Sequence, residues 1–131
     1  MKADKLQLTD LFGVLFATVG AYVVRAYFLD QPMRYDESWT YLLYVNQSWL
    51  AVFNYSAPNN HVLNSILIKI FTTIWGGHPE VIRLPAFIFG IAAVPLGYVL
   101  GKKLNGFGYF AALVLAIFPY LILFSTNAST G

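Results

Sequence analysis

Three long apolar runs limit what this chain can fold into. They cover residues 11–29, 81–100 and 107–124. A helix of about 20 residues is about 30 Å long, which matches the hydrocarbon thickness of a bilayer. Lys2 and Lys5 precede the first run as in a signal peptide, but that run is long and lacks a small-x-small cleavage site, so we interpret it as a retained anchor. The sequence therefore predicts an all-α integral membrane protein with three transmembrane helices at these positions.

The composition agrees with this class and excludes several others. The chain is 58% hydrophobic and 11% charged, whereas soluble domains carry about 25% charged residues. It has no cysteine, so disulfides, thiolate catalysis and cysteine metal sites are excluded. A net charge of +2 without a block of like charges argues against nucleic acid as a partner. His61 and His78 are too far apart and too poorly surrounded by ligands to predict a metal site.

Two shorter segments predict amphipathic helices that lie flat at the membrane interface, in the first outer loop. Residues 38–54 combine polar residues with tryptophan and tyrosine, whose rings favour the interface. Residues 61–75 are too few for a span and carry Lys69 near their centre. Their polar side chains recur on one helical face, which we expect to point toward residues 34–38.

The number of spans predicts the topology. With both short helices flat, three spans place the amino terminus and a basic loop at residues 102–106 on the same side. The positive-inside rule makes that side cytoplasmic. Residues 34–38, 59–60 and 125–127 would then meet the outer face. We expect a bacterial plasma membrane, with the endoplasmic reticulum as the alternative.

The segment Arg34-Tyr35-Asp36-Glu37-Ser38 contains the one pair of adjacent acidic residues in the sequence. An Asp at a helix start can simply cap free amide groups and favour the positive end of the helix dipole. The functional alternative is a general base beside a membrane-held substrate. Adjacent helical residues point about 100° apart, so Asp36 and Glu37 cannot both face one reacting centre. We expect one of these candidate catalytic carboxylates to act and the other to support it.

Several cationic or polar residues are predicted in the same outer layer, where they could bind an anionic headgroup such as phosphate. The candidates are Arg34, Asn59, Asn60, His61, Lys69 and Arg83. Each also has a structural alternative. Lys69 and Arg83 could snorkel, His61 could cap its helix, Arg34 could pair with Asp30, and the asparagines could form a turn.

Arg25 is the one charged residue inside the first predicted span. It could lie near the far interface and snorkel, because a long side chain can carry its charge to the polar layer. It could instead face the protein interior and meet an anion there. The sequence leaves both alternatives open.

The order of these elements resembles the amino-terminal end of multi-spanning GT-C glycosyltransferases, in particular the protein O-mannosyltransferase and lipid A aminoarabinose transferase group. Residues 56–63 stand where those enzymes have a His/Lys-Pro-Pro-Leu-like element, and residues 82–86 match their Arg-Leu-Pro-Ser/Ala entry into a span. The other similar stretches are Arg25, Leu29-Asp30, Asp36-Glu37 with the aromatic helix after it, and Gly101-Lys102-Lys103-Leu104.

The resemblance implies transfer of a sugar, with inversion, from a polyprenyl-phosphate carrier to a hydroxyl group on a protein, lipid or glycan. Asp36 would deprotonate the acceptor, cationic groups would stabilise the leaving phosphate, and Glu37 would be a support. No cofactor is indicated. Members of that group are several times longer and often have Arg-Gly-Tyr where this chain has Ser129-Thr130-Gly131. We therefore expect residues 1–131 to be the amino-terminal part of such an enzyme and to be inactive alone.

Two other classes of function were weighed against the enzyme. The first is a non-catalytic small membrane protein, an assembly subunit or flippase-like element, in which Asp36 only caps a helix. The second is a transporter, which is disfavoured because no predicted span has an acidic residue in its middle.

Overall fold

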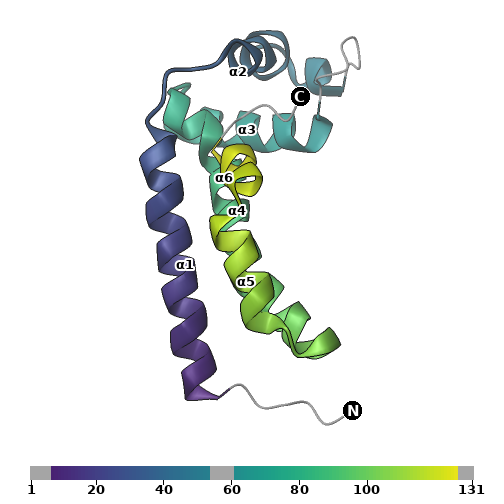
Figure 1. Cartoon of the computed structure of the whole chain (residues 1–131). Helices are drawn as coiled ribbons and strands as arrows, with labels where there is room; N and C mark the ends of the chain where they lie inside the picture. The colour runs from purple at the N-terminus through teal and green to yellow at the C-terminus, as the bar shows by residue number, and fades with distance from the viewer. Residues whose placement is uncertain (1–6, 54–60, 127–131) are drawn as a thin grey trace.

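The computed structural model describes residues 7–53 and 61–126, and within these ranges it contains helices and no strand. Three helical columns stand side by side, and shorter helical segments lie across one end of them (Figure 1). The columns are α1 (Leu8–Leu29), α4 (Pro79–Asn105) and the pair α5 (Gly108–Ile117) and α6 (Pro119–Ser125). The crossing layer contains α2 (Tyr35–Thr40), the π-helical turn η1 (Tyr41–Val45), the 3₁₀ turn η2 (Trp49–Phe53) and α3 (Val62–Trp75).

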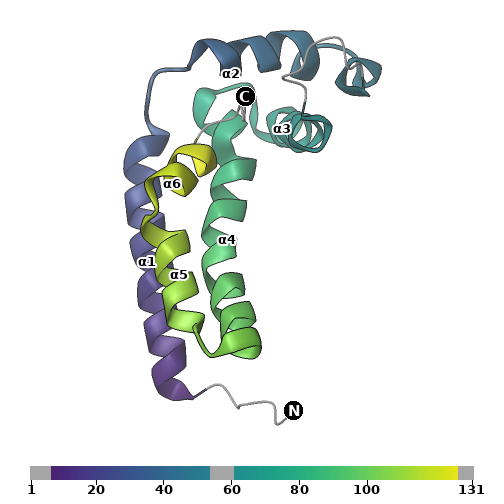
Figure 2. The same ribbon diagram turned by 45° about the vertical axis from the view of Figure 1, so that its right-hand side comes forward.

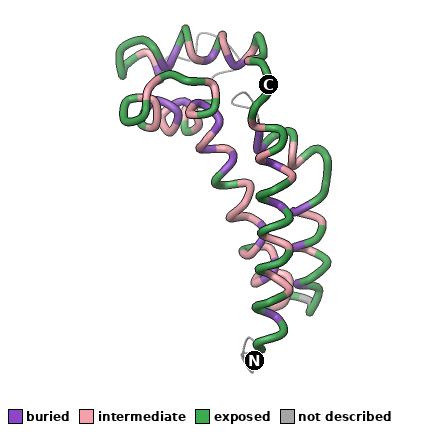
Figure 3. Tube along the Cα trace, turned by 90° about the vertical axis from the view of Figure 1, so that its left-hand side faces the viewer, coloured by how far each residue is buried: buried purple, intermediate pink, exposed green. Residues whose placement is uncertain are grey.

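The columns have the length and surface of membrane spans. Helices α1 and α4 are long and apolar enough to cross a membrane, and the α5–α6 pair makes a third candidate if it counts as one span. Large apolar side chains on their outer faces are exposed, among them Phe16, Phe89 and Phe110, and exposed positions run along the columns in Figure 3. The prediction of an all-helical fold with two or three helices able to span a membrane is confirmed for the described residues, whereas the number of spans and the flat placement of α3 on a bilayer stay predictions.

The second predicted span is longer than residues 81–100. Helix α4 continues to Asn105, so Lys102 and Lys103 lie in its last turn and not in a loop. Positive charge at this position is favourable because the carboxyl end of a helix carries partial negative charge. The chain turns at Gly106, whose φ of 74° is the left-handed conformation that glycine adopts readily after a helix. The basic loop expected over residues 102–106 is therefore mostly helix.

The third predicted span is not continuous. The sequence predicts one helix over residues 107–124, but α5 and α6 meet at 61°. The break lies at Phe118 and Pro119, where Phe118 has an extended ψ of 120°. Proline has no N–H and disfavours helical geometry for the residue before it. The prediction of one continuous helix over residues 107–124 is wrong for this reason, although the bent pair still counts as one candidate span.

The crossing layer also differs from the prediction in one of its two helices. The helix expected over residues 38–54 begins earlier, at Tyr35, and is interrupted between η1 and η2. The interruption covers Asn46, Gln47 and Ser48. Asparagine and serine bond readily to nearby backbone groups and so compete with helical hydrogen bonds. By contrast, α3 begins one residue after the predicted start at 61 and ends at the predicted Trp75.

The chain direction brings the amino-terminal end of α1 beside the α4–α5 turn, at the end of the columns away from the crossing layer (Figures 1 and 2). Three side chains hold this end together. Lys102 Nζ donates to the carboxylate of Asp10, and the Tyr109 hydroxyl donates to Asp10 Oδ1 at 3.0 Å. The start of α1 and the basic residues at the end of α4 thus lie at the same end of the columns, as the predicted topology requires.

Two small apolar clusters hold the helices together. One lies between the columns and contains Ala21, Val94, Tyr98, Ala112 and Ala116. The other joins the crossing layer to α4 and contains Val45, Ile68 and Ile82. Burying apolar area in this way stabilises contacts at about 25 cal/mol per Å² where water is the alternative. The second cluster fixes the layer that carries the predicted acidic pair.

Candidate functional site

Glu37 and Arg83 form a buried ion pair that joins α2 to α4. Arg83 Nε and Nη2 donate to the two carboxylate oxygens of Glu37 at 2.9 and 2.6 Å. Glu37 Oε2 also accepts the backbone N–H of Arg34 at 2.9 Å, which satisfies a free amide at the start of α2. The remaining Arg83 donors bond the carbonyls of Leu29, Gln31 and Pro32 at 2.7, 2.7 and 3.1 Å. This pair therefore fixes the whole turn between α1 and α2.

Lys69 has a similar structural contact at the other end of the crossing layer. Its Nζ donates to the carbonyl of Val45 at 2.7 Å and to the carbonyl of Gln47, and it lies 5.2 Å from the centre of the Trp49 ring. Lys69 therefore contacts the interruption after η1, and not residues 34–38, toward which the polar face of α3 was predicted to point. It supplies hydrogen bonds that the interrupted helix lacks.

Asp36 and Arg34 differ from these residues because no partner in the described part of the chain holds their charged ends. Asp36 is half-buried in the first turn of α2, and its carboxylate makes no hydrogen bond or ion pair within residues 7–53 and 61–126. The Arg34 guanidinium is exposed and, within the same ranges, does not pair with Asp30. The two adjacent acids therefore differ: Glu37 binds Arg83 and caps α2, whereas Asp36 has no partner among the residues that the structure describes.

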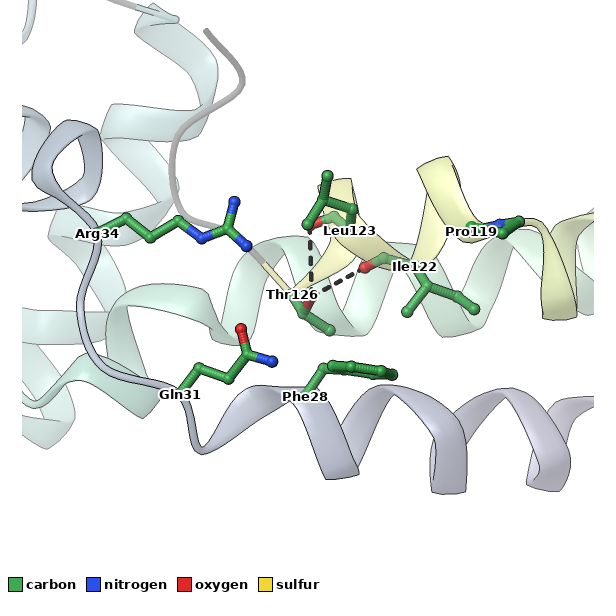
Figure 4. Close-up of a pocket in the computed structure, with 7 residues that line it drawn as sticks. All are labelled: Phe28, Gln31, Arg34, Pro119, Ile122, Leu123 and Thr126. Atoms are coloured by element: carbon green, nitrogen blue, oxygen red, sulfur yellow. Dashed lines mark hydrogen bonds between the residues drawn. The ribbon is translucent and has the colours of Figure 1, made fainter.

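A pocket of about 330 Å³ opens beside Arg34, between the end of α1 and α6 (Figure 4). Its lining residues are Phe28, Gln31, Arg34, Pro119, Ile122, Leu123 and Thr126. Arg34 and Gln31 extend toward α6 from the α1–α2 turn, while Phe28 and Ile122 form apolar wall. A guanidinium binds phosphate or carboxylate well, and apolar walls accept a hydrocarbon chain. The pocket therefore suits a molecule with an anionic head and an apolar tail.

The other predicted ligands are dispersed. His61 is exposed, and its side chain makes no capping hydrogen bond to α3. Asn59 and Asn60 lie outside the described residues. Lys69 and Arg83 are buried on carbonyl and carboxylate partners, so neither snorkels. Of the predicted cations, the structure brings Arg34 alone to this pocket.

Two polar residues of the pocket were missed at the level of sequence. These are Gln31 and Thr126, neither of which is among the site residues predicted from the sequence. The Thr126 hydroxyl donates back to the carbonyls of Ile122 and Leu123 at 2.9 and 3.3 Å. Neither residue belongs to a motif, so only the fold could bring them together.

Within the described ranges, no group of three or more His, Asp or Glu residues could hold a metal ion.

Comparison with protein-family models, with curated proteins and with solved structures gives no match for this chain.

Proposed function

We propose that this chain is the amino-terminal part of a membrane glycosyltransferase that takes its sugar from a polyprenyl-phosphate carrier. The observation that carries the proposal is the division of the acidic pair. Glu37 is bound by Arg83, while the Asp36 carboxylate has no hydrogen bond or ion pair within the described residues and follows Arg34, a lining residue of the pocket, by two positions. A carboxylate in the first turn of α2 and a guanidinium at the start of the same helix suit a reaction that removes a proton and releases a phosphate.

In the proposed reaction the Asp36 carboxylate accepts the proton of an acceptor hydroxyl. The hydroxyl oxygen then bonds to the anomeric carbon of the sugar from the face opposite the carrier, and the bond from that carbon to the phosphate oxygen breaks. The electron pair of that bond stays on the phosphate, and Arg34 stabilises the negative charge. One displacement inverts the anomeric carbon.

The proposed donor also accounts for where the pocket lies. It is found where α1 and α6 approach the crossing layer, at the end of helices that are long and apolar enough to span a membrane. A polyprenyl tail would remain in the bilayer while its phosphate reaches Arg34. We place this end of the columns at the outer face of a bacterial plasma membrane, with the amino terminus in the cytoplasm, since Lys102 and Lys103 lie at the opposite end.

The proposal is tested in membranes that contain the full-length protein, supplied with labelled polyprenyl-phosphate sugars and acceptors from a cell lysate. Asp36→Asn should lower transfer by about 10²–10⁴-fold, because the amide cannot accept the proton. Asp30→Asn is the matched control, since Asp30 is an exposed acid near the same turn. Equal transfer by the parent protein and Asp36→Asn would reject the proposed enzyme class.

The second candidate is a non-catalytic assembly subunit or flippase-like element. It is favoured by one observation: Lys69 and Arg83, predicted as phosphate ligands, are used to hold backbone carbonyls. A subunit of this kind should co-purify with another membrane protein in a fixed ratio. It should also support that partner equally well with Asp36→Asn, which separates it from the transferase.

A further inference from the structure

The break between α5 and α6 leaves carbonyls of α5 without their helical partners, among them those of Leu115 and Ala116. In a continuous helix the carbonyl of Leu115 would accept from residue 119, but that residue is Pro119, which has no N–H. The carbonyl of Ala116 would accept from residue 120, which the 61° bend carries away. Unpaired carbonyls are costly in an apolar environment, because no water is there to bond them.

Arg25, on the neighbouring helix α1, supplies donors to these two carbonyls. Its Nη2 donates to the carbonyl of Leu115 at 2.7 Å and its Nη1 to the carbonyl of Ala116 at 3.0 Å. The side chain is buried, with 1% exposure, so it does not snorkel. Within the described ranges no carboxylate forms an ion pair with it. Arg25 therefore meets backbone carbonyls in the interior, and not an anion from this part of the chain.

The same guanidinium also holds the far side of the break. Arg25 Nε donates to Ser125 Oγ at 2.8 Å, and Ser125 Oγ in turn bonds the carbonyl of Leu121 at 2.7 Å within α6. Gly90 on α4 leaves room for this contact. A Cβ at that position would lie 2.3 Å from Ser125 Cβ and 3.2 Å from Arg25 Nε.

We infer that Arg25 is a positioning residue that keeps α6 bent and so shapes the pocket beside Arg34. Helix α6 supplies Pro119, Ile122 and Leu123 to that pocket, and Thr126 follows at its end. If α6 continued along the axis of α5, these residues would move away from the end of α1 and would no longer line the pocket. The role of Arg25 concerns the pocket alone and does not depend on the reaction proposed for Asp36.

A simpler explanation is that Arg25 only stabilises the packing of α1 against its neighbours. The two explanations differ in their dependence on Pro119. A positioning residue is needed because Pro119 removes a helical hydrogen bond, so restoring that N–H should make Arg25 dispensable for stability. A packing residue should be equally necessary with or without the proline.

The test compares the unchanged chain with Arg25→Leu, Pro119→Ala and the double variant, purified in detergent. We expect Arg25→Leu to lower the unfolding temperature, and the double variant to recover at least half of that loss. If Arg25→Leu does not fold at all, recovery of folded double variant gives the same support. A double variant that is as unstable as Arg25→Leu, or that also fails to fold, would overturn the inference.

A distance measurement separates positioning from stability. Because the chain has no cysteine, spin labels can be placed uniquely at Tyr27→Cys on α1 and Phe124→Cys in α6, both at exposed positions. In the double variant α6 can straighten, which moves its far end by up to about 10 Å. A control pair on α1 and α5, Phe16→Cys and Phe110→Cys, should keep its distance. An unchanged Tyr27–Phe124 distance in the double variant would also overturn the inference.

Discussion

The carboxylate of Glu37 and the guanidinium of Arg83 are joined by two hydrogen bonds of 2.9 and 2.6 Å, and the two side chains are 0% and 2% exposed. The pair connects the first turn of α2 to α4 and lies under the turn that carries Arg34. Because Arg83 also holds three backbone carbonyls between α1 and α2, the position of Asp36 at the start of α2 depends on this buried pair.

Glu37→Gln should destabilise the protein strongly. The amide leaves Arg83 buried without its counter-charge, and breaking one side of a buried pair costs about 3–5 kcal/mol. Asp36→Asn, one residue away, should change the free energy of unfolding by no more than about 0.5 kcal/mol, since its carboxylate has no partner in the described residues. Chemical denaturation in detergent measures both values. Similar losses for the two variants would contradict the division of roles between the acids.

Lys69→Met should loosen the segment from η1 to η2. The methionine cannot donate to the carbonyls of Val45 and Gln47, which then lose their partner at the interruption. We expect faster amide hydrogen exchange over residues 45–53, with little change in α1. Lys103→Met is the control, because Lys103 is exposed. Equal exchange in the two variants would show that Lys69 does not hold this segment.

The helices that could be predicted from sequence are those whose pattern is local. The polar and apolar faces of residues 61–75 predict α3 almost to the residue. The apolar run after Asp10 likewise predicts α1. In both segments the same spacing that defines the helix also defines which face is buried, so no distant residue is needed.

The partners of the buried cations could not be predicted in the same way. The sequence shows that Lys69 and Arg83 carry charge and where they lie on their helices, but not that carbonyls at distant helix ends would be free to accept from them. The pocket has the same difficulty, because Arg34 and Thr126 come from opposite ends of the chain. The break at Pro119 is a different case. The proline itself indicates a helix break, whereas the apolar composition of residues 107–124 predicts a continuous span.

The topology can be tested with single cysteines, since the chain has none of its own. Tyr35→Cys lies at the crossing layer and Leu104→Cys at the opposite end of the columns, and the two native side chains are 80% and 76% exposed. In intact cells a membrane-impermeant maleimide should label position 35 and not 104. After the cells are opened, both should react. Labelling of position 104 alone in intact cells would contradict the proposed orientation. Labelling of both positions in intact cells would contradict their placement at opposite ends of the columns.

Gly108→Ala and Gly20→Ala should have different effects on the stability of the protein, and the comparison tests how closely α4 and α5 pack. A Cβ at Gly108 would lie 2.7 Å from the backbone oxygen of Tyr98 and 3.0 Å from its ring, so the two helices would have to separate. Such overpacking costs about 1–3 kcal/mol. A Cβ at Gly20 would meet no described atom within 4 Å, and alanine favours a helix interior by about 1 kcal/mol over glycine. Unfolding in detergent should therefore show a clear loss for Gly108→Ala and an unchanged or raised stability for Gly20→Ala. A loss of similar size in both variants would mean that α4 and α5 are not in close contact at Gly108.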